Sequence, residues 1–239
     1  MNSDKLSKRL EAVATYIPKG FSFADIGSDH AYLPCYMAKK DKISFAIAGE
    51  VVDGPYNSAV KQVKLEGLTS KVSVRKGNGL EVIQPSEVQC ITIAGMGGAL
   101  IADILEQGKD KLENVNRLIL QPNVSAYSVR KWLYSNDWEL VAEEILEEDG
   151  KIYEVLVAER GNQQSKQEVL NEKLMLLGPF LLISKNKAFV KKWMQEKNNW
   201  IRILNQLDAA PKTEENKKKS QELQAKIQLI NEVIGHETN

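Results

Sequence analysis

Apolar and polar positions alternate along the first two thirds of the chain in a pattern that predicts strands and helices in turn. Short apolar runs predict strands at 21–26, 44–49, 71–75, 88–94, 117–121, 138–146 and 152–158. Apolar residues at helical spacing predict helices at 3–17, with Ser3 as N-cap, and at 30–39, 53–66, 98–107 and 125–136. Strands that alternate with helices indicate a parallel sheet covered on both faces.

The last two of these strands change the expected fold. The turn Glu147–Lys151 between them contains an Asp-Gly step, which is typical of a tight hairpin and adds an antiparallel strand. A dinucleotide-binding dehydrogenase domain normally ends on a parallel strand. We therefore expect an α/β fold with the Rossmann-like sheet of class I methyltransferases, mostly parallel with one antiparallel strand.

The pattern changes again after Ala158. The polar run Gly161–Glu168 predicts a boundary, with one domain at 1–160 and a second at 161–239. Leucines spaced 4-3-4 predict a helix that Gly178-Pro179 interrupts. Two longer helices with apolar seams follow, and a short turn between them predicts an antiparallel, coiled-coil-like hairpin. Trp193 and Trp200 fit that seam better than they fit a platform for stacking bases.

Composition excludes several classes of protein. The chain has 239 residues, 43% of them hydrophobic, and no apolar run approaches the ~20 residues of a membrane span. Its N-terminus lacks a signal-peptide core. Two cysteines without a CxxC spacing make disulfides and zinc sites unexpected, so we expect a reduced, cytoplasmic protein. The last third carries an excess of bases over acids, which suits either a basic arm for an anionic polymer or an ordinary solvated surface.

Glycines and polar residues follow five of the predicted strands at the points where they end. The carboxyl ends of parallel strands meet at one edge of a sheet, where such folds bind ligands. The expected site gathers Gly27, Ser28, Asp29, His30, Glu50, Val51, Asn78, Gly79, Gly95, Met96, Gly97, Gln121 and Asn123. Agreement among five strand ends favours a binding crevice over a set of unrelated turns.

Individual residues in this set suit a nucleotide-like cofactor. At Gly27 a strand turns straight into a helix, a geometry that aims backbone N–H groups at a ligand. The missing side chain of Gly27 also lets the backbone approach the ligand closely. Glu50 ends the next apolar run, at a spacing that suits a carboxylate bound to two ribose hydroxyls. Asn78 can offer its amide to an adenine edge, and the small residues Gly95–Gly98 leave room for a flat base. His30 either touches the ligand or caps the following helix.

These motifs, in this order, resemble a known family. The strings DIGSDHAYLP, AGEVVDGPYNSAV, GNGLEV, ITIAGMGG and LILQPN are similar to those of class I S-adenosylmethionine-dependent methyltransferases, and more narrowly to the bacterial tRNA (adenine-22-N1)-methyltransferase family. The resemblance covers residues 1–160, and GSDHAYLP and AGMGG are its most specific parts. Asp29 departs from the small residue usual in methyltransferases, but an acid is expected there in the narrower family.

The resemblance implies S-adenosylmethionine as cofactor and N1 of adenine 22 of tRNA as the methyl acceptor. GMGG stands where exocyclic-amine methyltransferases carry an Asn-Pro-Pro-aromatic motif, which argues against N6. Because N1 already has a lone pair, no base must remove a proton, and catalysis is mostly positioning. We expect Asp29 to stabilise the cationic product and Gln121 and Asn123 to hold the base edge. Tyr32 either stacks on the base or packs within the protein.

Basic residues are candidates for holding tRNA through its phosphates. They are Lys5, Lys8 and Arg9 on the first helix, and Lys187, Lys191 and Lys192 on the hairpin, with the run Lys217–Lys219 beside them. An ordinary solvated surface is the alternative for each of them.

Other functions stay open on the sequence alone. The same cofactor core suits a methyltransferase that acts on another RNA, a protein or a small molecule, with the hairpin as a lid or dimer element. A partner-binding protein with a degenerate cofactor fold is the non-enzyme alternative, although the intact Gly27, Glu50 and GMGG argue against it. A nicotinamide dehydrogenase is disfavoured because G-x-G-x-x-G is missing. We expect no metal and no membrane partner; the oligomeric state is open, with a monomer favoured.

Overall fold

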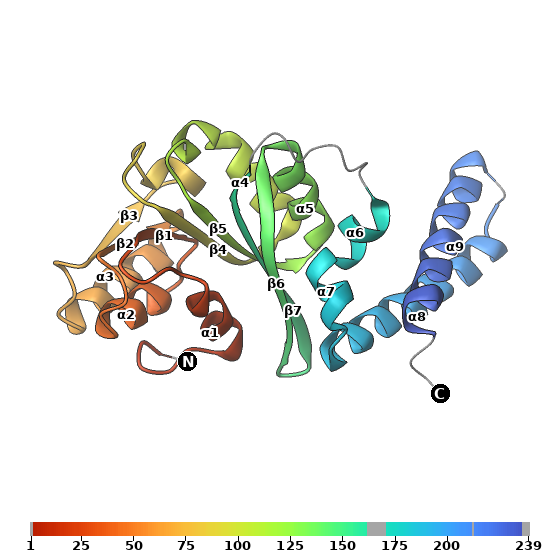
Figure 1. The fold of residues 1–239 in the computed structure, drawn as a ribbon, viewed down its shortest axis with the longest axis horizontal. Helices are drawn as coiled ribbons and strands as arrows, with labels where there is room; N and C mark the ends of the chain where they lie inside the picture. Colours follow the sequence, from red (N-terminus) through yellow and green to blue (C-terminus); the bar gives the residue numbers. More distant parts are fainter. Residues whose placement is uncertain (1, 162–170, 212, 236–239) are drawn as a thin grey trace. The chain divides into compact units, whose positions relative to one another are not determined.

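Seven strands form one sheet in the first part of the chain (Figure 1). The structure, a computed structural model, describes residues 2–161, 171–211 and 213–235. The strands are β1 (Ser22–Ile26), β2 (Phe45–Glu50), β3 (Val72–Lys76), β4 (Cys90–Gly97), β5 (Arg117–Val124), β6 (Trp138–Glu148) and β7 (Lys151–Arg160). Their order is β3-β2-β1-β4-β5-β7-β6. β1 to β5 pair in parallel, whereas β7 runs antiparallel to both β5 and β6, so the predicted fold class is confirmed.

Helices connect the strands and continue beyond them. They are α1 (Lys8–Thr15), α2 (Tyr32–Lys39), α3 (Asp53–Leu65), α4 (Gly98–Gln107), α5 (Ala126–Ser135), α6 (Glu172–Leu177), α7 (Pro179–Ser184), α8 (Lys187–Ala209) and α9 (Glu214–Ile234). Two short 3₁₀ turns, η1 (Gly79–Val82) and η2 (Lys109–Leu112), were not predicted. No helix within the described ranges is both long and apolar enough to cross a lipid bilayer.

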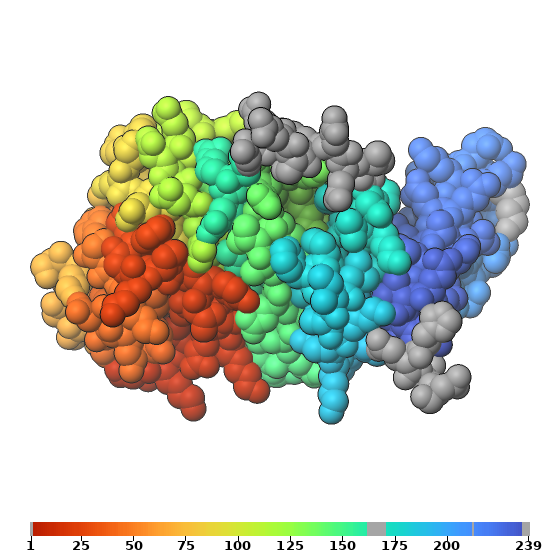
Figure 2. Space-filling model, viewed as in Figure 1, coloured from red at the N-terminus to blue at the C-terminus, as the bar shows by residue number. Residues whose placement is uncertain are grey.

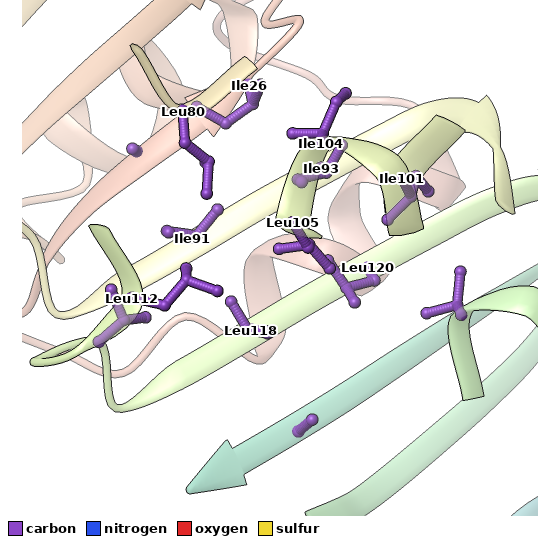
Figure 3. Packing of buried hydrophobic residues seen from close by; sticks show 14 of the residues in the cluster. Ile26, Leu80, Ile91, Ile93, Ile101, Ile104, Leu105, Leu112, Leu118 and Leu120 are labelled. Carbon is purple, nitrogen blue, oxygen red and sulfur yellow. The ribbon is translucent and has the colours of Figure 1, made fainter. Parts of the chain in front are cut away.

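Two apolar cores lie on opposite faces of the sheet. Ala24 and Ile26 of β1 join the core beneath α4 and α5. Figure 3 shows part of this core, with Ile26 close to residues of α4 and of the neighbouring strands. Phe23, the neighbour of Ala24, joins the other core with α1, α2 and α3. In the space-filling view the N-terminal residues lie against those of α2 and α3 (Figure 2). Because both faces of the central strands are buried, their sequences are apolar nearly throughout. Asp25 is an exception, and it is buried at 4% exposure.

Two predicted helix starts are wrong. α1 begins at Lys8 rather than near residue 3, because the Ser7 hydroxyl accepts a hydrogen bond from the Leu10 N–H (3.3 Å) and caps the helix there. Ser3, the expected cap, is buried and donates instead to Glu66. α2 begins at Tyr32 rather than near residue 30, because the residues before it adopt a left-handed backbone. β4 and β5 also extend past their predicted ends, so the segments GMG and PN belong to strands.

The chain divides into two compact units, Met1–Phe180 and Leu181–Asn239. The sequence suggested a boundary at residue 160, followed by the polar run Gly161–Glu168, of which all but Gly161 lies outside the described residues. The first unit continues to Phe180 because α6 packs on α5. The predicted break at Gly178-Pro179 separates α6 from α7, and Gly178 has a φ of +86°, which favours glycine.

The second unit is the helical hairpin of α8 and α9. The Lys185 ammonium donates to the Val233 carbonyl (3.1 Å), which places the start of α8 beside the end of α9 and makes the pair antiparallel. Trp193 is buried, and its ring lies 6.3 Å from the half-buried Trp200 and 6.2 Å from Phe189. These aromatic side chains form a packed row along α8.

A buried ionic cluster ties α5 to the closing hairpin of the first unit. The Arg130 guanidinium lies 2.6 Å from carboxylate oxygens of both Glu143 and Glu154, and all three side chains are at most 3% exposed. Arg130 also donates to the Met175 carbonyl of α6 (3.2 Å), while Glu143 accepts from the N–H of Phe180 (3.0 Å). Burial raises the pKa of Glu143, and the charge of Arg130 opposes this rise.

Replacing Arg130 with Met is therefore expected to lower the free energy of unfolding by about 3–5 kcal/mol, because two carboxyl groups lose their buried partner. Urea denaturation of the whole chain measures this loss. The control is Lys71→Met, which removes the exposed ion pair with Asp41 and is expected to cost no more than about 1 kcal/mol. Equal losses for the two variants would contradict the assignment.

Candidate functional site

A cavity of ≈ 220 Å³ opens at the carboxyl edge of the sheet. Its lining is Arg9, Leu10, Asp25, Gly27, Ser28, Asp29, Ala94, Gly95 and Met96. The ends of β1 and β4, which are neighbours in the sheet, thus line the cavity. Hydrogen bonds join the ends of β2 and β5 to residues of this lining. Four of the five predicted strand ends are therefore brought together.

Gly27 brings β1 close to the end of β4. Its φ is +70°, and a Cβ there would lie 2.2 Å from the terminal methyl of Met96. The N–H groups of Gly27 and Ser28 donate to the Gly49 carbonyl of β2, at 2.9 and 3.2 Å. These two N–H groups therefore bind β2 within the protein and are not left for a ligand. Close approach of the backbone remains the role that glycine can serve here.

The turn after Ser28 has an unusual backbone. Asp29, His30 and Ala31 all have positive φ, of 38°, 51° and 53°, and none is glycine. Such residues are rare and concentrate at functional sites. The N–H of Asp29 donates to the carboxylate of Glu50, which fixes the start of the turn. The Asp29 side chain is 69% exposed and lies 3.5 Å from Nε2 of His30.

His30 and Tyr32 stack on each other on the outside of this turn. Their ring centroids are 5.2 Å apart and the planes differ by 15°. His30 therefore has a partner within the protein, and it forms no helix cap because α2 begins only at Tyr32. Of the two interpretations of Tyr32, packing within the protein is the one for which a contact exists.

Asp25 belongs to the site, although the sequence did not single it out. It accepts hydrogen bonds from the hydroxyls of Ser28 (2.6 Å) and Thr92 (2.6 Å). Burial raises its pKa, and the two hydroxyl bonds and the charge of Arg9 oppose the rise. The sequence does carry a signal for Asp25: an acidic residue stands inside an apolar strand. A buried carboxyl group needs polar partners, so such a residue indicates a polar site.

Glu50 ends β2 as a buried carboxylate with one oxygen engaged. Its Oε1 accepts from the N–H of Asp29, while its Oε2 has no hydrogen-bond partner in the described part of the chain. Burial raises the pKa of Glu50, and the bond from Asp29 opposes this. The next two residues, Val51 and Val52, are apolar yet 56% and 57% exposed.

Two amide side chains of β5 bind the backbone of Gly95, one at its N–H and one at its carbonyl. The N–H of Gly95 donates to Oε1 of Gln121 (2.9 Å), and Nδ2 of Asn123 donates to the carbonyl of Gly95 (2.8 Å). Arg9 of α1 also donates to Oε1 of Gln121, at 2.6 Å. Gly95 lies at a bulge in β4 and has a φ of +81°. We refer to Arg9, Gln121, Gly95 and Asn123 as the amide network.

Arg9 was predicted to contact tRNA phosphates together with Lys5 and Lys8. It is half-buried and lines the cavity. Glu148 at the end of β6 accepts from the backbone N–H groups of Lys8 (2.6 Å) and Arg9 (3.3 Å) and so anchors the start of α1. Lys5 and Lys8 themselves are exposed, as a contact with phosphate requires.

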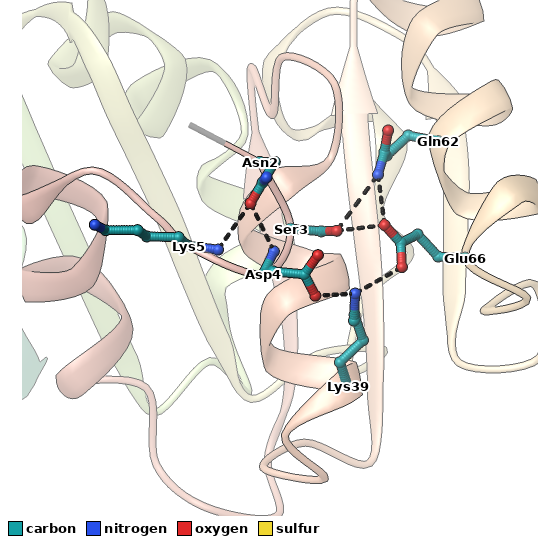
Figure 4. A network of polar contacts seen from close by, with 7 residues as sticks. All are labelled: Asn2, Ser3, Asp4, Lys5, Lys39, Gln62 and Glu66. Atoms are coloured by element: carbon teal, nitrogen blue, oxygen red, sulfur yellow. Dashed lines mark hydrogen bonds and ion pairs between the residues drawn. The ribbon is translucent and has the colours of Figure 1, made fainter.

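Residues before α1 tie it to α2 and α3, as Figure 4 shows. Ser3 donates to Glu66, which also accepts from Gln62 (2.9 Å) and from Lys39 (2.8 Å). Lys39 reaches Asp4 as well. This N-terminal segment, together with Glu148, holds the helix that delivers Arg9 to the cavity.

The remaining predicted site residues lie elsewhere or make other contacts. The N–H of Asn78 donates to Glu81 (2.9 Å), and a Cβ on Gly79 would lie 3.0 Å from Ile104, so in the described structure both residues shape η1. Gly97 packs near Val124 at the end of β4. The predicted lysines at 187, 191 and 192 lie on α8, in the second unit, where Lys192 covers the Trp193 ring at 5.0 Å.

Among the described residues, no group of three or more His, Cys, Asp or Glu side chains could hold a metal ion.

Comparison with known proteins identifies relatives over nearly the whole chain. The tRNA (adenine(22)-N(1))-methyltransferase of Bacillus subtilis (strain 168) is 56% identical over 237 residues, which cover 99% of this chain and 100% of that protein. The crystal structure of the B. subtilis M1A22 tRNA methyltransferase matches with a TM-score of 0.91 at 55% identity, over 97% of this chain and 99% of that chain.

A second solved structure is that of a putative tRNA (m1A22) methyltransferase from Streptococcus pneumoniae in complex with S-adenosyl-L-methionine. It matches with a TM-score of 0.86 at 46% identity, over 96% of this chain and 100% of that chain. The model of the tRNA (adenine(22)-N(1))-methyltransferase family matches residues 23–232, from the second residue of β1 to near the end of α9. On this evidence, and on the arrangement of its strand ends, the chain belongs to the tRNA (adenine(22)-N(1))-methyltransferase family.

Proposed function

We propose that this chain transfers the methyl group of S-adenosylmethionine to N1 of adenine 22 in the D-arm region of tRNA. The observation that carries the proposal is a cavity lined by the ends of β1 and β4, to which hydrogen bonds tie the ends of β2 and β5, in a chain that matches this family from residue 23 to residue 232. The ends of β1 and β2 serve the cofactor, the end of β5 serves the base, and the end of β4 lies where the two must meet.

The residues at the ends of β1 and β2 fit S-adenosylmethionine, which when bound supplies an activated methyl group on a sulfonium. The second oxygen of the Glu50 carboxylate can accept from a ribose hydroxyl, because only the first is bonded to Asp29. The exposed apolar surface of Val51 suits the face of an adenine ring. The other proposed cofactor contacts are Gly27, Ser28, His30, Asn78, Gly79, Gly95, Met96 and Gly97.

The protein's part in the chemistry is to position the acceptor. Adenine N1 carries a lone pair, so methyl transfer requires no general base. Holding N1 in line with the methyl group can supply on the order of 7–11 kcal/mol of the barrier. The base must leave its stack to enter the cavity, at a cost of a few kcal/mol. Asn123, which is exposed and fixed on the Gly95 carbonyl, is suited to hold its edge, and the buried Gln121 supports Asn123 from within the protein.

Asp29 is suited to stabilise the positive charge that develops on the base. Its carboxylate is at the cavity lining and 69% exposed, and the left-handed turn holds its backbone in place. A negative charge near the acceptor favours the transition state over the neutral substrate. The reaction so described involves residues of one chain and no metal ion.

The tRNA body is held outside the cavity in this proposal. Lys5, just before α1, and Lys8, at its start, are exposed near Arg9 of the lining, so phosphates flanking a base in the cavity come within their reach. Lys187, Lys191 and Lys192 of α8 supply further basic groups for the same polymer.

Incubation with unmodified tRNA transcript and S-adenosylmethionine, followed by nucleoside mass spectrometry, tests the proposed activity. We expect 1-methyladenosine from a transcript with adenine at position 22 and none when that position is uracil. An N6-methyladenosine product, or no methylation of any tRNA, would refute the assignment.

Replacing Asp29 with Asn is expected to lower kcat by about 10²-fold, the order found when one electrostatic contact to a transition state is removed. The affinity for S-adenosylmethionine, measured by calorimetry, should change little, because the backbone N–H that binds Glu50 remains. A drop in cofactor affinity that matches the drop in kcat would instead assign Asp29 to cofactor binding.

The double variant Lys5→Gln/Lys8→Gln is expected to weaken tRNA binding and to reduce the slope of log K against log salt by about two, one for each lost phosphate contact. Filter binding at several salt concentrations measures both quantities. Lys61→Gln/Lys64→Gln is the matched control, because these exposed lysines lie in the second half of α3, which runs away from the carboxyl edge. Equal slopes for the two variants would show that α1 does not contact phosphate.

A further inference from the structure

In the amide network, the orientation of the Gln121 and Asn123 amides follows from neighbours that can only donate or can only accept a hydrogen bond. The guanidinium of Arg9 and the N–H of Gly95 can only donate, and both lie at one atom of the Gln121 amide, at 2.6 and 2.9 Å. That atom is therefore the oxygen. The carbonyl of Gly95 can only accept, so the Asn123 atom 2.8 Å from it is the nitrogen.

The oxygen of Asn123 is consequently left as the acceptor of this network. Its partner within the protein is the Nε2 of Gln121, at a long 3.4 Å, and both Asn123 and Gly95 are exposed. The Gln121 oxygen already has two donors, whereas the Asn123 oxygen has one distant donor within an exposed residue. The end of β5 thus presents a hydrogen-bond acceptor at the carboxyl edge, next to the lining residue Gly95.

We propose that Arg9 is a positioning residue that sets the specificity of the site for adenine. Arg9 holds the Gln121 oxygen together with the Gly95 N–H, so the Gln121 amide nitrogen stays turned toward Asn123 and supports the Asn123 oxygen as the acceptor for the base. This inference rests on the proposed function. The acceptor receives the exocyclic amino group of adenine, whose neighbour on the ring is the N1 to be methylated. Guanine carries an oxygen at that place, and two facing acceptors repel each other.

The contacts of Arg9 suit a role inside the cavity better than a contact with a tRNA phosphate. Its guanidinium lies 3.4 Å from the position that a Cβ on Gly95 would occupy and 5.5 Å from the centroid of the Tyr153 ring. Glu148 fixes its backbone N–H at 3.3 Å. A lysine has the charge but not the planar donor geometry, so the two residues are not equivalent here.

The test compares two tRNAs that differ only at position 22, one with adenine and one with unsubstituted purine, which lacks the amino group. The measured quantity is the ratio of kcat/KM for the two RNAs. Purine N1 is intrinsically less reactive, but this difference is the same for every enzyme variant and cancels when the ratios are compared. We expect Arg9→Met to reduce the adenine-to-purine ratio about tenfold, the factor for one hydrogen bond of about 1.4 kcal/mol.

Two further variants separate positioning from other roles. Asn123→Ala is expected to reduce the ratio as Arg9→Met does, and the double variant to reduce it no further, because both act on one acceptor. Lys8→Met, on the same helix, is the matched control and should lower kcat/KM for both RNAs equally. Calorimetry with S-adenosylmethionine confirms that each variant is folded.

An unchanged ratio in Arg9→Met, with kcat/KM lowered equally for both RNAs and restored by Arg9→Lys, would assign Arg9 to phosphate and overturn the proposal. An additive double variant would also overturn it. Failure of the proposed function itself has a different signature: the unaltered enzyme would then leave adenine 22 unmethylated.

Discussion

Polar side chains buried at the carboxyl edge of the sheet must find partners within the protein, and the whole site depends on this constraint. Asp25, Glu50 and Gln121 are each at most 6% exposed. Asp25 binds Thr92 of β4, Glu50 binds the turn after β1, and Gln121 binds the end of β4 together with α1. Every one of these pairings joins two different elements. The partners that satisfy the buried groups therefore also fix the strand ends relative to one another.

The left-handed turn after β1 has an unfavourable backbone conformation that other interactions must offset. Three L-residues in this conformation cost on the order of 1–2 kcal/mol each. A hydrogen bond to a charged group contributes about 1.5–3 kcal/mol, so the bond from Asp29 to Glu50 offsets only part of the strain. Burial of Ala31 and of Leu33 and Met37 in α2 supplies the rest. The turn is thus held by the packing of the helix that follows it, and Asp29 keeps its side chain exposed at the cavity.

Local patterns predicted the elements, but not the contacts between them. The helix at 98–107 was predicted to the residue, because its apolar spacing and glycine boundaries are local signals. The strand-end rule likewise identified the edge at which the cavity lies. What it missed depends on distant partners: the carbonyl of Gly49 takes the N–H groups of Gly27 and Ser28, and Arg9 reaches Gln121 across 112 positions of sequence. Pattern alone carries no information on such pairs.

The position of Arg9 illustrates which forces decide the geometry of the site. The polar contacts of the N-terminal segment are partly exposed, and an exposed ion pair such as that of Lys39 with Asp4 contributes little to stability. Leu6 and Val13 are 4% and 0% exposed, and each contributes about 1.5–3 kcal/mol by burial. Apolar packing therefore holds α1 against the sheet. The polar contacts select its register, because a shift of one residue would leave Glu148 without its N–H donors and Gln121 without its guanidinium.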